Sequence, residues 1–352
     1  MPVAGAGPRC RLAPYGLGAQ RARRETALLN GLRSQSSEGR QKIKVTIVTE
    51  SEHRELARIA AAYGLAVERS SRLSGGAENL TYLLKTTRRL VVATILLKKS
   101  ETAAGLYVDY LMSLHANGFP VPVLLARCDG GYTSRYGARP ALLFDYVEGH
   151  QYKVLPSRFL PQVGTTLAKL HASNSLQCEL PPCLRLSFED IEDIGPKVDR
   201  EFVRWARHWH EQVEYIVGLP VSMVATHGDL FVDNLLVDAQ GRVLFIDWED
   251  GARDGRWVDL STALLGLCTF EKFQPARAHA LLGAYVRDAC QEIDSVALRD
   301  ATVYAAVYAA VHRYRRQSQR SIRPGQGRSY RALQPVVDSL MSDWNISNNW
   351  WL

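Results

Sequence analysis

The stretch from residue 227 to residue 249 limits the possible folds more than any other part of this 352-residue chain. It reads HGDLFVDN and continues into two apolar runs, 235–237 and 243–246, which flank the turn sequence 238–241 (DAQG). This pattern predicts a β-hairpin. Counting ladder pairs back from the turn places Asn234 opposite the 245–247 end of the returning strand, so that Asn234 and Asp247 can hold one cation between them.

The residue types of this segment indicate phosphoryl transfer. A carboxylate and an amide oxygen form a hard ligand pair that suits Mg²⁺, which keeps several waters and binds substrate phosphates. Asp229 stands five residues before Asn234, the Asp-to-Asn spacing of the protein-kinase catalytic loop, in which the Asp orients the attacking hydroxyl. The tripeptide His-Gly-Asp alone is a common loop sequence, so the prediction rests on the loop, the hairpin and Asp247 occurring together.

The segments HGDLFVDN and FIDWE resemble the signature of the aminoglycoside phosphotransferase and choline-kinase-like superfamily, over roughly residues 60–345. The resemblance implies an α+β, two-lobed protein-kinase-like fold. We expect residues 45–147 to form a small antiparallel β N-lobe with one helix, which binds nucleotide, and residues 148–352 to form a mainly α-helical C-lobe with the catalytic loop, the metal site and the acceptor site. ATP and Mg²⁺ are the implied co-substrate and cofactor.

The same resemblance assigns roles to individual residues. Asp229 matches the catalytic base, and Asn234 and Asp247 match the residues that hold magnesium. His227 matches a histidine that supports the loop. Asp259 matches a recurrent Asp-Leu after the metal site, and we expect it to brace the loop or cap the next helix. Glu249 is placed with the residues that support the loop.

Nucleotide contacts are expected from three places in the N-lobe. Gly75, Gly76 and Asn79 lie between two predicted strands, as in a loop that covers phosphates, although paired glycines also mark ordinary hairpins. Asp145, Tyr146 and Val147 resemble the hinge whose backbone reads adenine, and an ordinary linker is the alternative. The family's usual phosphate-binding lysine is replaced by Thr94. Lys98 is the candidate substitute, with Lys99 beside it and Lys85 as the other choice.

Bacterial homoserine kinases of this type also have a threonine at the position that matches Thr94. The segments 77–84 (AENLTYLL) and 163–171 (VGTTLAKLH) resemble the sequences of these enzymes too. The residues after Asp247, WEDG, differ from the homoserine-kinase sequence and leave the acceptor open. An acidic group (Glu189, Asp190, Glu192, Asp193) would suit a polycationic antibiotic, whereas arginines between 313 and 331 would suit a substrate carboxylate or phosphate. Solvated surface charge is the alternative for both groups.

The expected function is therefore ATP·Mg-dependent phosphorylation of a hydroxyl on a small molecule: a homoserine-like amino alcohol, an amino sugar or an antibiotic. The alternatives are an antibiotic-resistance phosphotransferase specifically, or a nucleotide-binding pseudokinase regulator. A protein kinase is disfavoured because no activation-loop segment with an APE-like end follows Asp247. The expected partners are ATP and the acceptor, with the chain a monomer or a homodimer.

Charge and cysteine content exclude other classes. Residues 1–44 carry nine Lys/Arg against Glu25 and Glu38, which accounts for the whole net charge of +7 and argues against a nucleic-acid partner. This basic extension is expected to be disordered, with a targeting segment or an upstream start as alternatives. The six cysteines show no CxxC pair, which favours the cytoplasm. No apolar stretch reaches the roughly 18 residues of a membrane span.

Hydrophobic periodicity gives the expected elements. Strands are predicted at 67–73, 80–85, 90–97, 124–128 and 141–146, and a helix at 102–117. A Thr49-x-x-Glu52 capping box should begin an earlier helix. From residue 160 onward the pattern is mainly helical, apart from the hairpin at 234–247.

Overall fold

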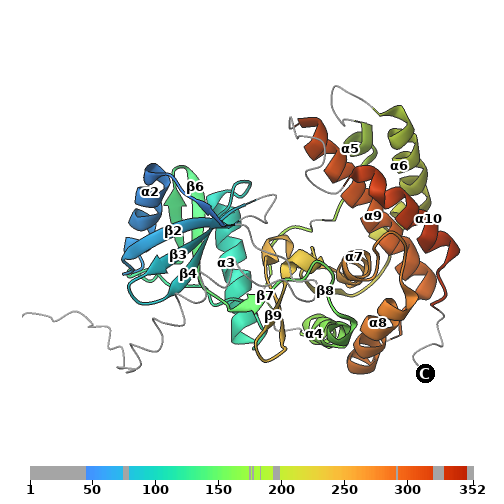
Figure 1. Cartoon of the computed structure of the whole chain (residues 1–352). Helices are drawn as coiled ribbons and strands as arrows, with labels where there is room; N and C mark the ends of the chain where they lie inside the picture. Colours follow the sequence, from blue (N-terminus) through green and yellow to red (C-terminus); the bar gives the residue numbers. More distant parts are fainter. Residues whose placement is uncertain are drawn as a thin grey trace, which may run out of the picture. The chain divides into compact units, whose positions relative to one another are not determined.

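A computed structural model describes residues 45–73, 79–173, 176, 178–182, 184–192, 199–290, 292–319 and 329–346. The predictions for residues 1–44, Gly75 and Gly76 lie outside these ranges. All described residues belong to one compact unit, residues 39–352. Their N-terminal part is strand-rich and their C-terminal part is mainly helical (Figure 1).

The strand-rich part is a six-stranded antiparallel sheet with the order β1-β2-β3-β4-β6-β5. The strands are β1 (Val45–Ile47), β2 (Val67–Leu73), β3 (Leu80–Thr86), β4 (Leu90–Ile95), β5 (Thr133–Tyr136) and β6 (Arg139–Asp145). Strands β2, β3, β4 and β6 lie within a few residues of the predicted ranges.

A helix covers each face of this sheet (Figure 1). Helix α2 (Glu50–Ala61) begins at the predicted capping box, in which the Thr49 side chain and the Glu52 side chain each bind the other residue's backbone. Its buried residues pack with Ala141 and Leu143 of β6. Helix α3 (Glu101–Ala116) packs in a second cluster with Leu142 and Phe144. Successive side chains of β6 point to opposite faces of the sheet, so this one strand contributes to both clusters.

The strand predicted at 124–128 is wrong. Residues there form only one isolated bridge, from Leu124 to Phe144, and the neighbour of β6 is instead β5, which sequence analysis missed. Strand β5 reaches β6 through a tight turn at Gly137, whose φ of 56° requires the left-handed region that glycine adopts easily. This local hairpin occupies the edge of β6. Strand β5 has the polar sequence TSRY, so a search for alternating apolar residues does not detect it.

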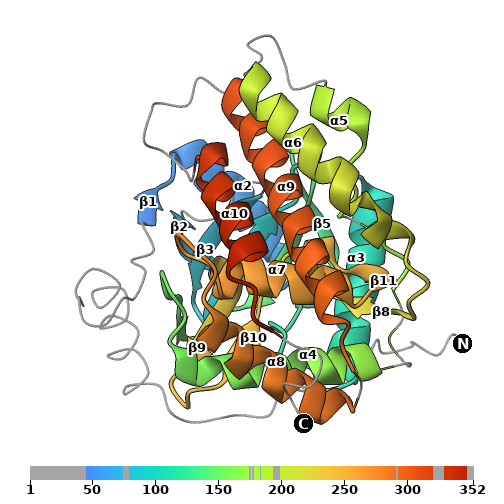
Figure 2. The same ribbon diagram turned by 90° about the vertical axis from the view of Figure 1, so that its right-hand side faces the viewer.

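The helical part is built from pairs of packed helices (Figure 2). Helix α4 packs against α8, and α9 packs against α6, α7 and α10. A Cβ atom on Gly164 of α4 would lie 2.1 Å from the carbonyl oxygen of Leu281, so glycine permits this close approach to α8. The helices are α4 (Leu160–Ala172), α5 (Phe188–Glu192), α6 (Arg200–Val213), α7 (Trp257–Leu267), α8 (Pro275–Ala289), α9 (Ser295–Gln319) and α10 (Gln334–Ser342).

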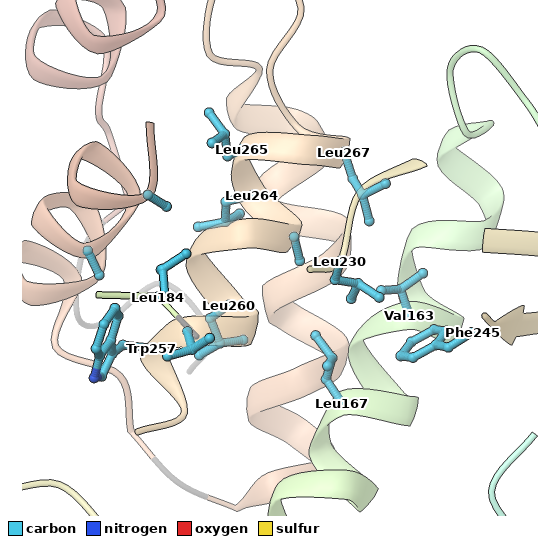
Figure 3. Packing of buried hydrophobic residues seen from close by; sticks show 14 of the residues in the cluster. Val163, Leu167, Leu184, Leu230, Phe245, Trp257, Leu260, Leu264, Leu265 and Leu267 are labelled. Carbon is cyan, nitrogen blue, oxygen red and sulfur yellow. The ribbon is translucent and has the colours of Figure 1, made fainter. Parts of the chain in front are cut away.

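Short strands interrupt the helices near the predicted site. The predicted hairpin is present as β9 (Leu235–Asp238) and β10 (Val243–Phe245), with β7 (Gly149–His150) paired to β9. Strands β8 (Met223–Thr226) and β11 (Ala252–Gly255) form a separate pair. Phe245 and Leu230 anchor this region in the hydrophobic core together with Val163 and Leu167 of α4 (Figure 3).

No helix among the described residues combines the length and the apolar character that crossing a bilayer requires.

Candidate active site

The loop after β8 brings Asp229 and Asn234 into direct contact. The Asn234 side-chain amide donates to the carbonyl oxygen of Asp229 at 2.7 Å and to its Oδ2 at 2.9 Å. Asn234 ends the 3₁₀ helix η3 (Val232–Asn234) and is buried. Because its Nδ2 is used by Asp229, the Oδ1 atom of Asn234 is the one suited to bind a cation.

The hairpin register then brings Asn234 beside Asp247. Phe245 pairs with Leu235, and the Ile246 amide donates to the Asn234 carbonyl at 3.0 Å, so Asp247 follows the residue opposite Asn234. Asp247 has φ 63° and ψ 59°, a left-handed conformation that non-glycine residues adopt rarely and that often marks functional sites. The amide oxygen of Asn234 and the carboxylate of Asp247 together fit a hard divalent cation such as Mg²⁺.

The His227 ring links the loop that bears Asp229 to the segment that leads into Asp247. Its Nε2 donates to the Ile246 carbonyl at 3.0 Å, and its Nδ1 accepts from the Asp229 amide at 3.4 Å. Burial lowers the pKa of His227, against the opposing effects of the Asp259 charge and the Ile246 carbonyl. The ring is therefore neutral at neutral pH, which agrees with one nitrogen donating and the other accepting.

Asp259 holds the start of the loop. Its fully buried carboxylate accepts from the His227 amide at 2.9 Å and from the Gly228 amide at 2.8 Å. The Nε2 of His171, on α4, lies 3.1 Å from Oδ2 of Asp259. Asp259 belongs to the first turn of α7, so this helix and α4 fix the backbone from which Asp229 projects.

Aromatic side chains of α3 lie against the segment that follows Asp247. The hydroxyl of Tyr110 donates to the Thr226 carbonyl at 2.8 Å, and its ring packs edge-on against Trp248. A Cβ atom on Gly251 would come within 2.3 Å of the Tyr110 ring, so only glycine fits there. Burial, reinforced by the charges of nearby carboxylates including Asp247, raises the pKa of Tyr107 well above its usual value.

Lys99 contacts this segment, and sequence analysis had placed Lys98 at the site. The Lys99 Nζ donates to the Glu249 carbonyl at 2.8 Å and lies 6.0 Å from the centre of the Tyr107 ring. Lys98 is exposed, and Lys85 pairs with Glu68 at 3.0 Å. The only sequence signal for Lys99 was its position two residues before the start of α3, near the end of β4.

The remaining predicted nucleotide contacts lie at the ends of the sheet strands. Thr94 is within β4, and the Asn79 Oδ1 accepts from the Leu97 amide at 3.4 Å. The Asp145 carboxylate pairs with Arg89 at 2.7 Å.

Backbone groups at the predicted hinge are already partly used. The amide of Asp145 donates to the Val123 carbonyl at 2.8 Å, and that of Tyr146 donates to the Leu90 carbonyl at 3.3 Å. In the described part of the chain, the Val147 amide makes no such backbone hydrogen bond.

Several of the charged residues considered for the acceptor already take part in ion pairs. Arg315 pairs with Asp190 at 3.0 Å, and Arg207 pairs with Glu192 at 3.1 Å. Arg331 pairs with Asp199 at 2.6 Å. Of these pairs, Arg315–Asp190 joins the two groups, and Asp193, Arg320, Arg323 and Arg328 lie outside the described residues.

Comparison with known proteins identifies the family. Residues 70–298 match the phosphotransferase enzyme family. The chain belongs to this family. Among curated relatives it is 27% identical over 231 residues to the homoserine kinase of Agrobacterium fabrum, which covers 60% of this chain and 69% of the relative. It is 25% identical over 260 residues to homoserine kinase of Pseudomonas aeruginosa, with 68% and 79% covered.

Solved structures show the same fold. Choline kinase LicA from Streptococcus pneumoniae matches with a TM-score of 0.62 at 17% identity, over 82% of this chain and 99% of the other. Spectinomycin phosphotransferase in complex with ADP and spectinomycin matches with a TM-score of 0.60 at 13% identity, over 88% and 97%. These neighbours confirm the expected two-lobed, kinase-like α+β fold. The relatives are small-molecule kinases, and this family member is an enzyme of that type.

Proposed function

We propose that this phosphotransferase moves the γ-phosphoryl group of ATP, in a magnesium-dependent reaction, to a hydroxyl group of a small molecule. The observation that carries the proposal is the joint arrangement of three residues. The Asp229 carboxylate accepts a hydrogen bond from the Asn234 side chain. The backbone hydrogen bond from Ile246 to Asn234 places Asp247 beside them, and Asp247 has a left-handed backbone conformation. Packing alone gives no reason for this set of polar groups on one loop and one hairpin.

Each residue has a defined task in this reaction. Asp229 orients the acceptor hydroxyl and takes its proton, while the Asn234 amide keeps the Asp229 carboxylate in place. The Asn234 Oδ1 and the Asp247 carboxylate would hold Mg²⁺, which when bound neutralises charge on the transferring phosphates. Lys99 supplies the cation that the family places on the strand at Thr94, and the Val147 amide binds the adenine edge. The contact of Lys99 with the Glu249 carbonyl keeps it at the metal segment.

The acceptor class is proposed from the relatives. The curated relatives named above are homoserine kinases, so a homoserine-like hydroxy amine is favoured over an antibiotic. Asp190 and Glu192 of the acidic group are each paired with an arginine, which also makes a polycationic antibiotic the less favoured acceptor. The cytoplasmic location and the monomeric or dimeric state stay predictions of the sequence.

The test is ADP release from the purified chain with MgATP and a panel of hydroxyl acceptors. The panel contains homoserine, choline, ethanolamine, hexosamines and aminoglycosides. Asp229→Asn should lower kcat by a factor on the order of 10² or more, with nucleotide binding retained. Asp233→Asn is the matched control, because Asp233 lies in the same loop and is exposed. Its kcat should stay within about twofold of the wild-type value.

The outcomes separate the proposal from the pseudokinase alternative. An Asp229→Asn variant that works at the wild-type rate would refute the assignment of the base. The protein could instead bind MgATP and release ADP at the same rate with and without the Asp229 carboxylate, whether an acceptor or only water is present. That result would favour a nucleotide-binding regulator.

A further inference from the structure

Arg185 is held in place by a buried carboxylate and an indole ring. Its Nη2 donates to Oδ1 of Asp254 at 2.9 Å, and its Nη1 donates to the Leu184 carbonyl at 3.0 Å. The guanidinium carbon lies 5.8 Å from the centre of the Trp257 ring. The Asp254 side chain is 3% exposed, whereas that of Arg185 is 37% exposed. The arginine therefore combines a fixed inner side with an open outer side.

This arrangement is attached to the elements that carry the catalytic loop. Asp254 is on β11, which pairs with β8, and β8 leads directly into His227. Trp257 and Asp259 belong to the same first turn of α7, and Asp259 binds the loop amides. Leu184, the residue before Arg185, packs in the same core cluster as Trp257 (Figure 3). Arg185 is thus placed within the region that positions Asp229.

Stability alone does not account for Asp254. Its Oδ2 is buried and has no hydrogen-bond partner in the structure, while Oδ1 accepts from both Arg185 and the Gly255 amide, the latter at 2.7 Å. A buried carboxylate oxygen without a donor lowers stability, and an ion pair that is one-third exposed on the arginine side returns little. Its clear effect is to fix the direction of the Arg185 guanidinium.

The donors around this guanidinium suit an anion. Arginine has five N–H donors, and two of those of Arg185 are used by Asp254 and Leu184. Tyr304 packs edge-on against Trp257 with ring centres 5.9 Å apart, and its hydroxyl accepts from the Leu186 amide at 2.9 Å. Because Tyr304 is buried, its role is to hold the Trp257 ring against which Arg185 lies, and the three remaining N–H donors of Arg185 are the groups left for an anion.

We propose that Arg185, oriented by Asp254 and Trp257, binds a carboxylate of the hydroxyl acceptor, which makes the acceptor a hydroxy acid or a hydroxy amino acid. The proposal rests on the proposed phosphotransferase function. A carboxylate matches the planar fork of arginine. A phosphate dianion would need more positive charge than one arginine paired with an aspartate provides. The neighbouring Arg253 and Arg256 donate to the Met223 and Glu292 carbonyls.

The experiment compares acceptors that differ only by a carboxylate. L-Homoserine is paired with 3-aminopropan-1-ol and L-serine with ethanolamine, in the ADP-release assay with Asp229→Asn as the blank. We expect the carboxylate-bearing member of at least one pair to be used with a kcat/KM at least about tenfold higher, the effect of one charge-assisted hydrogen bond. Arg185→Gln should raise the KM for that acceptor about 10- to 100-fold, with kcat and the KM for MgATP within about twofold.

Three further variants separate binding from structure. Arg207→Gln, which breaks the 3.1 Å pair with Glu192, should change neither KM. Asp254→Asn should raise the acceptor KM with a smaller effect than Arg185→Gln, because the arginine remains but is less firmly held. If Arg185→Gln does not fold, the double variant Arg185→Gln/Asp254→Asn removes both charges and should fold with the same KM defect.

Several results would overturn the inference. Equal use of the two members of each pair would do so, as would an Arg185→Gln enzyme with an unchanged acceptor KM. ADP release that depends on Asp229 and is supported by choline, a hexosamine or an aminoglycoside, but not by L-homoserine or L-serine, would leave the kinase intact and refute this subsite. If the proposed kinase activity itself were wrong, the result would differ: the wild type and Asp229→Asn would release ADP at the same rate, even with water as acceptor.

Discussion

The contact of Asp259 with the catalytic loop allows a quantitative prediction for Asp259→Asn. The carboxylate accepts from the amides of His227 and Gly228 and lies 3.1 Å from the His171 Nε2, all in a fully buried position. Asparagine keeps the shape but replaces one acceptor oxygen with an N–H₂ group. At least one of the three donors must then lose its acceptor or face another donor.

The expected cost follows from the strength of such bonds. A hydrogen bond to a buried charged group contributes about 1.5–3 kcal/mol, and a buried donor left without an acceptor adds a penalty, so we expect a loss of about 3 kcal/mol. For a unit that spans residues 39–352, that corresponds to a decrease in Tm of about 4–5 °C. Because the His227 and Gly228 amides fix the start of the loop that bears Asp229, kcat should also fall by about tenfold or more.

Calorimetry and ADP release on the same preparation measure the two effects. Asp338→Asn on α10 is the control, because Asp338 is exposed and the same chemical change there should leave Tm and kcat unchanged. If Asp259→Asn melted within about 1 °C of the wild type, its hydrogen bonds would not be holding the loop, and the reasoning would be refuted.

Three further perturbations test other parts of the site. Lys99→Met should raise the KM for MgATP about tenfold while Lys98→Met has little effect, and equal effects in steady-state kinetics would remove Lys99 from the phosphate site. Burial lowers the pKa of His227 from 6.5, so its contribution to stability is complete above that pH and is lost as the pH falls below it. Urea unfolding should show a loss of stability as the pH falls below about 6.5, and His227→Phe should lack this part of the loss. Gly251→Ala places Cβ 2.3 Å from a buried ring carbon and should cost about 1–3 kcal/mol in thermal unfolding, whereas Gly283→Ala, which meets nothing within 4 Å, should be neutral or stabilising.

The parts of the site that were predicted correctly are those fixed by local backbone rules. Turn residues set the register of a hairpin, so counting from Gly241 was enough to place Asn234 beside the residue before Asp247. The capping box at Thr49 is likewise a contact between residues three apart. The strand predicted at 124–128 failed because its alternative, β5, depends on the turn at Gly137 rather than on apolar alternation.

The residues that the structure adds to the proposed site depend on contacts between residues far apart in the sequence. Lys98 and Lys99 are adjacent and chemically identical, and only the packing of α3 against the segment after Asp247 brings Lys99 to the Glu249 carbonyl. No local pattern marks Arg185 either, because its partner Asp254 is 69 residues away. The catalytic loop, in contrast, carries its own geometry within a few residues. Chemistry that is local in sequence can therefore be predicted from it, whereas the residues proposed to bind the phosphates and the acceptor are brought into place by tertiary packing. Relatives with the same loop can differ in substrate at such positions.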